Sequence, residues 1–344
     1  MITFYAPDAP SVRPDTPQQC AELTGTALWI DLLDPSQEEE QQLEAALGID
    51  IPTREEMQAI ELSSRLYEEN GVLFMTGTVL THATTSTPQS SAVTFILLAN
   101  KLVTLRYADP APFNAFRVRR EANLQRYQSA GQFLEGIVEA VIERVADILE
   151  GVGANLDRLR LRVFEPESNQ PAVPVQRTLR SSRGGQARKA RQRDYVEVLR
   201  RIGAVSDLVS RTRESLVSFT RLVAFYREMR RDEGSATRES AAHLKTIVGD
   251  LGALSDHASF LSTKVSFLLD ATLGMINNEQ NASIKILSVA ALVFLPPTLV
   301  AGVYGMNFEH MPELKWVYGY GFAMTVMLAS AILPYLWFKR KGWL

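Results

Sequence analysis

The chain has 344 residues, enough for about two domains, and its formal net charge is −3. A net charge this small argues against a protein that binds nucleic acid by general electrostatic attraction. The single cysteine, Cys20, excludes an intrachain disulfide and a cysteine-based zinc site within one subunit.

Residues 1–125 predict a cytoplasmic α/β domain. The first residues lack the basic and apolar regions of a signal peptide, so we expect the N-terminus to stay in the cytoplasm. Ser36 followed by Glu39 indicates a helix that begins with a capping box. Four short apolar runs predict strands, and the third and fourth predict a hairpin. These runs lie at 27–32, 71–80, 92–99 and 101–107.

Residues 126–235 predict a long antiparallel helical hairpin. From Leu134 to Val163 apolar residues recur every three or four positions, which is typical of one face of a helix. Glu165-Pro166 ends this pattern, and helical character resumes toward Arg230 after a loop that contains Pro and Gly.

Residues 236–284 predict a stalk helix with an apolar heptad face that packs along neighbouring helices. No strong helix breaker occurs before Pro296-Pro297, so we expect this helix to continue into a membrane. The apolar face consists of Leu244, Ile247, Leu251, Leu254, Ala258, Leu261, Val265, Leu268, Thr272 and Met275.

Residues 285–344 predict two membrane-spanning helices joined by a short outer loop. The stretches between Lys285 and Glu309 and between Lys315 and Lys339 lack charged residues. Each holds about 23 residues, or roughly 35 Å of helix, which exceeds a hydrocarbon core of about 30 Å. The basic cluster 339–341 predicts that both chain ends lie on the cytoplasmic side of the cell inner membrane. A pair of buried core helices is the alternative.

A second stripe runs along the stalk and the first span, on a different face from the apolar heptads. Two helices cannot enclose a pore, so conduction requires several copies with one helix from each around an axis. A stripe of polar, small and medium apolar residues suits a pore wall, although the asparagines alternatively form hydrogen bonds between stalks. The stripe consists of Asp270, Gly274, Asn277, Asn281, Ile284, Leu287 or Ser288, Ala291, Leu295, Thr298, Gly302 and Gly305.

The first span ends in Tyr304-Gly305-Met306-Asn307, and Met311-Pro312-Glu313-Leu314 follows in the outer loop. This motif between two terminal spans resembles the CorA family of magnesium transporters. The resemblance extends over 294–316 and to the basic tail 337–344, and more weakly to the stalk and the α/β domain.

The resemblance implies a homopentamer with a cytoplasmic funnel that transports Mg²⁺ and needs no other cofactor. It implies a selectivity filter of Gly305, Met306 and Asn307, below which the stripe forms the pore wall and its inner polar rings, with Glu309 and Glu313 in the outer loop. Regulatory Mg²⁺ sites between subunits are expected at Asp250 and Asp270. The implied partners are further copies of the chain, membrane lipid and divalent metal ions, but not nucleic acid.

The basic stretch 177–193 departs from the family, in which the tip of the helical hairpin is often acidic. A solvated helix face and loop is the favoured interpretation, and contact with anionic lipid is an alternative.

These features predict a channel-like transporter of hydrated Mg²⁺, and of Co²⁺ or Ni²⁺ as well, driven by the membrane potential and gated by intracellular Mg²⁺. A zinc transporter of the same superfamily and a non-conducting membrane adaptor are the alternatives. An enzyme is not expected, because the sequence offers no nucleophile with a base and an orienting group.

Overall fold

The computed structural model describes residues 1–14, 16–59, 61–85, 87–164, 183–232, 238–306 and 317–341. The chain divides into two compact units. The first consists of Met1–Val175 and Val196–Leu269, and the second of Gln176–Tyr195 and Asp270–Leu344. The boundaries of the four segments expected from the sequence stay predictions.

The first unit contains a mixed sheet of six strands in the order β1-β2-β6-β5-β4-β3. Neighbours β2 and β6 are parallel, and the other neighbouring pairs are antiparallel. The four predicted strands are confirmed as β2, β4, β5 and β6, whereas β1 and β3 were not predicted. The strands are β1 (Ile2–Tyr5), β2 (Trp29–Leu33), β3 (Leu66–Glu69), β4 (Val72–Thr81), β5 (Gln89–Leu98) and β6 (Lys101–Arg106).

Two-residue turns join the strands of two hairpins. Asn70 and Gly71 connect β3 to β4 with φ angles of 53° and 78°, which suits this sequence because Asn-Gly adopts positive φ readily. Leu98 pairs with Lys101 across the turn between β5 and β6, which confirms the predicted hairpin.

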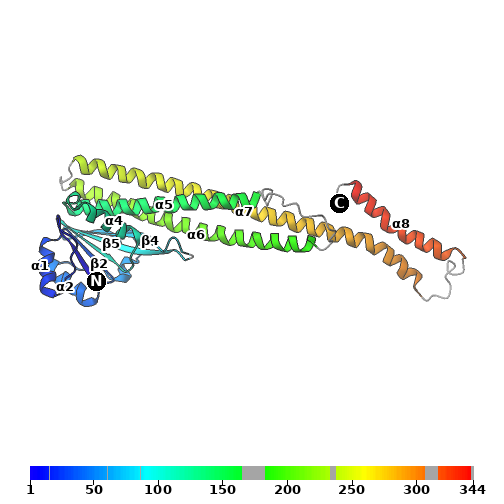
Figure 1. Ribbon diagram of the computed structural model, residues 1–344, viewed down its shortest axis with the longest axis horizontal. Helices are drawn as coiled ribbons and strands as arrows, with labels where there is room; N and C mark the ends of the chain where they lie inside the picture. Colours follow the sequence, from blue (N-terminus) through cyan, green and yellow to red (C-terminus); the bar gives the residue numbers. More distant parts are fainter. Residues whose placement is uncertain are drawn as a thin grey trace. The chain divides into compact units, whose positions relative to one another are not determined.

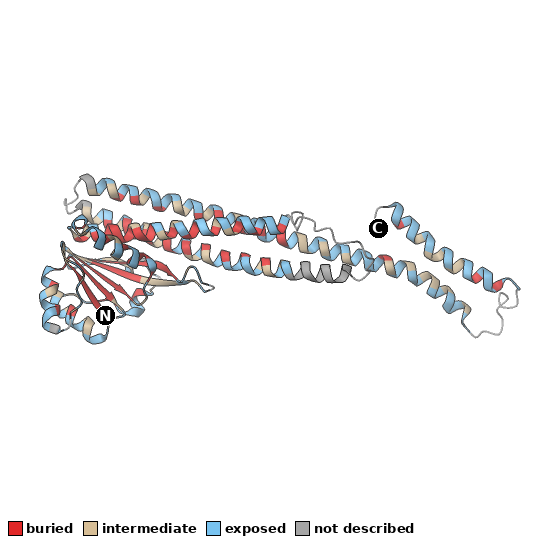
Figure 2. Ribbon diagram, in the orientation of Figure 1, coloured by how far each residue is buried: buried red, intermediate tan, exposed pale blue. Residues whose placement is uncertain are grey.

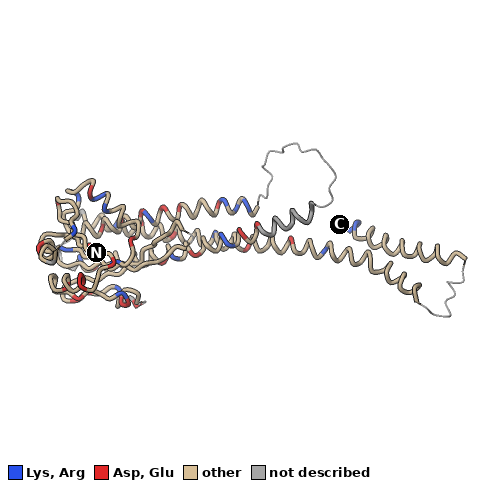
Figure 3. Tube along the Cα trace, turned by 60° about the horizontal axis from the view of Figure 1, so that its bottom comes forward, with Lys and Arg blue, Asp and Glu red and all other residues tan. Residues whose placement is uncertain are grey.

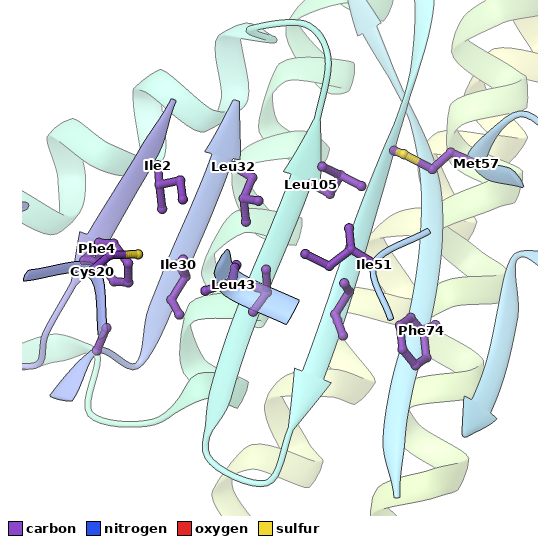
Figure 4. Packing of buried hydrophobic residues seen from close by; sticks show 13 residues of the cluster. Ile2, Phe4, Cys20, Ile30, Leu32, Leu43, Ile51, Met57, Phe74 and Leu105 are labelled. Carbon is purple, nitrogen blue, oxygen red and sulfur yellow. The ribbon is translucent and has the colours of Figure 1, made fainter. Parts of the chain in front are cut away.

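Three short helices, α1 (Pro17–Thr26), α2 (Gln37–Leu47) and α3 (Arg54–Met57), contribute to the core on one side of the sheet. Cys20, Leu43 and Met57 from these helices pack with strand residues such as Ile30 and Phe74 (Figure 4). The capping box of α2 is confirmed, because Ser36 Oγ accepts from the Glu39 N–H and the Glu39 carboxylate accepts from the Ser36 N–H.

Longer helices pack against the sheet through aromatic side chains. Trp29 of β2 lies 5.5 Å from Phe116 of α4 (Ala111–Ala122) and 5.8 Å from Phe133 of α5 (Ala130–Phe164), between ring centroids. Phe95 of β5 lies 6.2 Å from Phe219 of α6 (Arg183–Asp232). Short 3-10 helices at 62–64 and 124–126 complete the connections.

A buried ion pair joins the two parallel strands at the centre of the sheet. Arg106 of β6 donates from Nε and NH2 to the two carboxylate oxygens of Asp31 of β2, at 2.9 and 2.7 Å. Thr104 also donates to Asp31, and it accepts from the Trp29 indole. Removing one partner of such a buried pair costs about 3–5 kcal/mol, so this network fixes the pairing of β2 with β6.

The remaining helices are α7 (Arg238–Tyr304) and α8 (Gly319–Arg340). Within the first unit α6 contacts β4, where Ser215 Oγ donates to the Thr78 carbonyl at 2.6 Å, and Lys264 of α7 pairs with Asp157 of α5 at 2.8 Å. Helices α5, α6 and the first part of α7 lie along one another (Figure 1). The predicted architecture, an α/β domain followed by long helices and two apolar C-terminal helices, is confirmed.

Candidate ion pathway

The helix α7 carries the residues that we expect to line the pore. It continues through Pro296 and Pro297 as far as Tyr304, although each proline lacks the N–H that would bond the carbonyl four residues earlier. The Thr298 hydroxyl in the next position lies 3.0 Å from the Phe294 carbonyl oxygen and 2.8 Å from that of Leu295, so its oxygen is satisfied within the helix. The proline pair therefore does not end the helix.

The predicted apolar face of α7 is buried in the first unit. Leu254 is half-buried. The other members up to Leu268 are all buried, namely Leu244, Ile247, Leu251, Ala258, Leu261, Val265 and Leu268. The heptad prediction is confirmed for this part of the helix.

The predicted pore stripe lies on exposed surface of α7. Leu287 is 73% exposed and Leu295 is 64% exposed, in a region that Figure 2 draws as mostly exposed or intermediate. Ile286 and Phe294 on other faces are exposed to the same degree, so the stripe is distinguished by its polar and small residues. The exposed stripe residues are Asp270, Gly274, Asn277, Asn281, Ile284, Leu287, Ala291, Leu295, Thr298 and Gly302.

The helix α7 ends at the predicted filter motif. Gly305 N–H donates to the Ala301 carbonyl at 2.9 Å and Met306 N–H to the Val303 carbonyl at 3.3 Å. A Cβ atom at Gly305 would lie 3.1 Å from that Ala301 oxygen, so glycine permits the close backbone approach here. Three other predicted residues, Asn307, Glu309 and Glu313, lie outside the described residues.

The helix α8 is the second apolar helix. No charged residue occurs in α8 before Lys339 and Arg340 in its last turn (Figure 3). By length and composition, α8 and the C-terminal part of α7 are both able to cross a membrane. The basic stretch at 177–193 falls on residues or side chains outside those described.

The two carboxylates expected at regulatory metal sites are both exposed. Asp250 belongs to the first unit, and Asp270 is the first residue of the second unit on α7. Within the described part of a single chain, no group of three or more His, Cys, Asp or Glu side chains is arranged to hold a metal ion. Any such site needs ligands that this part of one chain does not supply.

A charged cluster at the beginning of α7 was not predicted. Glu135 of α5 is 5% exposed and accepts a hydrogen bond from Ser240 of α7 at 2.9 Å. Arg230 of α6 lies 3.8 Å from Glu135, and His243 of α7 lies 3.3 Å from Glu139. Burial raises the pKa of Glu135, against the opposing effects of Ser240, His243 and Arg230. Glu135 directly follows Leu134, the first residue of the apolar pattern of α5. The spacing of apolar residues alone does not show whether a charged residue at this position faces the core.

Comparisons with known proteins show the family of the chain. A family model described as "CorA-like Mg2+ transporter protein" matches residues 25–340. The magnesium transport protein CorA of Escherichia coli K12 is 33% identical over 318 residues, which cover 92% of each chain. The chain belongs to the CorA-like Mg²⁺ transporter family. This membership confirms the expectation of an ion transporter rather than an enzyme.

Solved structures extend the family likeness to the fold. The complete structure of the CorA magnesium transporter from Methanocaldococcus jannaschii matches with a TM-score of 0.72 over 100% of this chain and 98% of that chain, at 17% identity. The cytoplasmic domain of ZntB from Vibrio parahaemolyticus matches less closely, with a TM-score of 0.54 at 10% identity over 81% of this chain and 98% of that chain. The family architecture therefore extends over the whole chain.

Proposed function

We propose that the chain transports hydrated Mg²⁺ through a channel-like path in the cell inner membrane, formed by α7 helices of a homopentamer. The observation that carries this proposal is the exposed stripe from Asp270 to Gly302, which leads to Gly305-Met306 at the end of α7. Family membership supports Mg²⁺ as the principal ion. Co²⁺ and Ni²⁺ are proposed as further ions.

The chemistry of the filter follows from the hydration of Mg²⁺. Magnesium loses its water ligands reluctantly, so a filter that releases the ion quickly binds the hydration shell instead of the bare ion. Amide oxygens of an Asn307 ring accept hydrogen bonds from the bound waters without the strong attraction of a carboxylate ring. Below this ring, the exposed leucines at 287 and 295 would form an apolar constriction that closes by losing its water.

The membrane potential supplies the driving force in this proposal. Moving two positive charges across about 100 mV is worth roughly 4.6 kcal/mol. No sequence typical of ATP-hydrolysing phosphate loops is present. Inward movement of Mg²⁺ against a considerable gradient therefore needs no second energy source.

Asn307→Ala tests the filter. We expect this variant to lose most Mg²⁺ flux, because the acceptors for the hydration shell disappear while little packing changes. Flux is measured into liposomes with an inside-negative potential, after size exclusion confirms the assembly of the parent protein. Asn307→Asp is the companion variant, in which tighter binding of the ion slows its release.

Near-normal Mg²⁺ flux through Asn307→Ala would contradict the assignment of the filter. Parallel measurements with Zn²⁺ separate the zinc alternative, since a zinc transporter would carry Zn²⁺ in preference to Mg²⁺. Absence of flux for every divalent cation in the parent protein would favour the non-conducting adaptor.

A further inference from the structure

A basic pocket in the first unit is lined by none of the residues predicted for the ion pathway. It has a volume of about 410 Å³ and lies between the beginning of β3 and one face of α6. Residues of α6 reach it from successive turns, because positions three or four apart share a helix face. Its charged lining consists of Arg65, Arg213, Glu214 and Arg221.

Several other arginines of α6 form ion pairs within their own helix, unlike Arg213 and Arg221 of this pocket. Arg200 and Arg201 pair with Glu197, and Arg211 pairs with Asp207. Among the described residues, neither Arg213 nor Arg221 makes an ion pair, and both side chains are exposed. Three arginines and one carboxylate leave the pocket with an excess of positive charge.

Arg65 is held in place on the opposite wall of the pocket. Its Nε donates to the Ala59 carbonyl at 2.6 Å, and its NH1 donates to Thr78 Oγ1 at 3.4 Å. These bonds orient the guanidinium and leave its NH2 group for another acceptor. A planar guanidinium binds two oxygens of a phosphate at once, which makes arginine better suited than lysine to phosphate recognition.

A second pocket of about 340 Å³ shares Arg65 and Glu214 with the first and adds Arg54. Ser90 also lines it, and the buried Ser90 hydroxyl has no hydrogen-bond partner within the described part of the chain. The cationic lining therefore continues past Arg65 to Arg54 in the second pocket.

We propose that this surface binds a small molecule with two or more linked phosphate groups, such as a nucleoside triphosphate. Arg213 and Arg221 are eight positions apart, or about 12 Å along the helix, so the cations are spread along the pocket, which suits a chain of phosphates. Leu66 and Val217 beside the arginines provide apolar contact for the rest of the ligand. This binding site shares no residue with the filter or the stripe.

Calorimetric titration of the full-length protein in detergent with pyrophosphate and with ATP tests the proposal. EDTA is present throughout, so that removal of Mg²⁺ by the ligand does not contribute. We expect saturable binding that weakens on the order of tenfold in Arg213→Gln and in Arg221→Gln, as for the loss of one charged hydrogen-bond donor. Glu214→Gln is expected to bind several-fold more tightly, because a repelling carboxylate is removed.

Arg227→Gln is the matched control, since Arg227 is an exposed arginine of α6 that does not line the pocket. Equal binding of pyrophosphate and ATP would support recognition through phosphate alone, and tighter binding of ATP would support added contact with the nucleoside. The proposal is overturned if neither ligand binds the parent protein at millimolar concentration. It is also overturned if Arg227→Gln weakens binding as much as Arg213→Gln, or if Glu214→Gln leaves the affinity unchanged.

Discussion

We propose that single carboxylates on α7 determine how the channel responds to Mg²⁺. Asp250 and Asp270 are exposed, and in the proposed homopentamer each would face copies of itself or of other carboxylates. Two such charges about 4 Å apart repel by roughly 1 kcal/mol in water and about 4 kcal/mol near a protein surface. A bound divalent cation offsets this repulsion, so we propose that intracellular Mg²⁺ closes the funnel and its depletion opens it.

Protease digestion of the reconstituted protein, with and without millimolar Mg²⁺, measures this closure. We expect Mg²⁺ to slow digestion of the parent severalfold, and Asp270→Asn to lose much of that protection. Asp250→Asn should act in the same direction. Asp256→Asn is the control, because Asp256 is exposed on α7 but is not one of the two residues expected at a regulatory metal site. Equal protection of all four proteins would remove the regulatory role of Asp250 and Asp270.

At the scale of secondary structure, periodic patterns predicted the elements whose packing is regular. The buried face of α7 and the strands β4 to β6 follow from apolar spacing, because each buries one side against a single neighbouring layer. The strand β3 was missed because it is a short edge strand, and two of its four residues are glutamates. The Asn70-Gly71 pair that follows it is nevertheless a strong hairpin signal. The buried position of Glu135 depends on contacts with α6 and α7, which no local pattern contains.

The contact between α5 and the beginning of α7 predicts a pH dependence of stability. Burial raises the pKa of Glu135 in the folded protein, so the folded state binds this proton more tightly than the unfolded state. The resulting stabilisation is fully present below the unfolded pKa and is lost as pH rises through the folded pKa. Glu135→Gln keeps an acceptor for Ser240 but cannot titrate.

Thermal unfolding midpoints between pH 4 and pH 7 measure this effect. The midpoint of the parent protein, relative to that of Glu135→Gln, should fall as pH rises. Glu150→Gln replaces an exposed glutamate of the same helix and should give a difference that is flat with pH. Measuring the parent and Glu135→Gln again, each with the additional substitution His243→Gln, removes the nearby imidazole from the comparison. A flat difference between parent and Glu135→Gln would show that Glu135 is not the group responsible.

At the scale of the whole molecule, one chain does not complete the proposed pathway. The stripe on α7 is exposed, and two membrane helices cannot surround an ion, so further copies must supply the rest of the wall. The sequence indicates the stripe and the motif because both are local patterns. The number of copies and the placement of their carboxylates depend on packing between chains. Such packing does not produce a repeating pattern in the sequence comparable to the stripe.

The two spans and the basic C-terminal end predict the orientation of the protein in the membrane. Lys339, Arg340 and Lys341 follow the second span directly, and such clusters stay on the cytoplasmic side. With two spans, we expect both chain ends to share that side and only the short loop to face outward. Cys20 is buried and the only cysteine of the chain, so single cysteines introduced elsewhere can be labelled selectively. We expect His310→Cys to react in intact cells with a maleimide that cannot cross the membrane, and Trp343→Cys to react only after the membrane is permeabilised. The reverse pattern would place the first unit outside the cell, where it could not sense intracellular Mg²⁺.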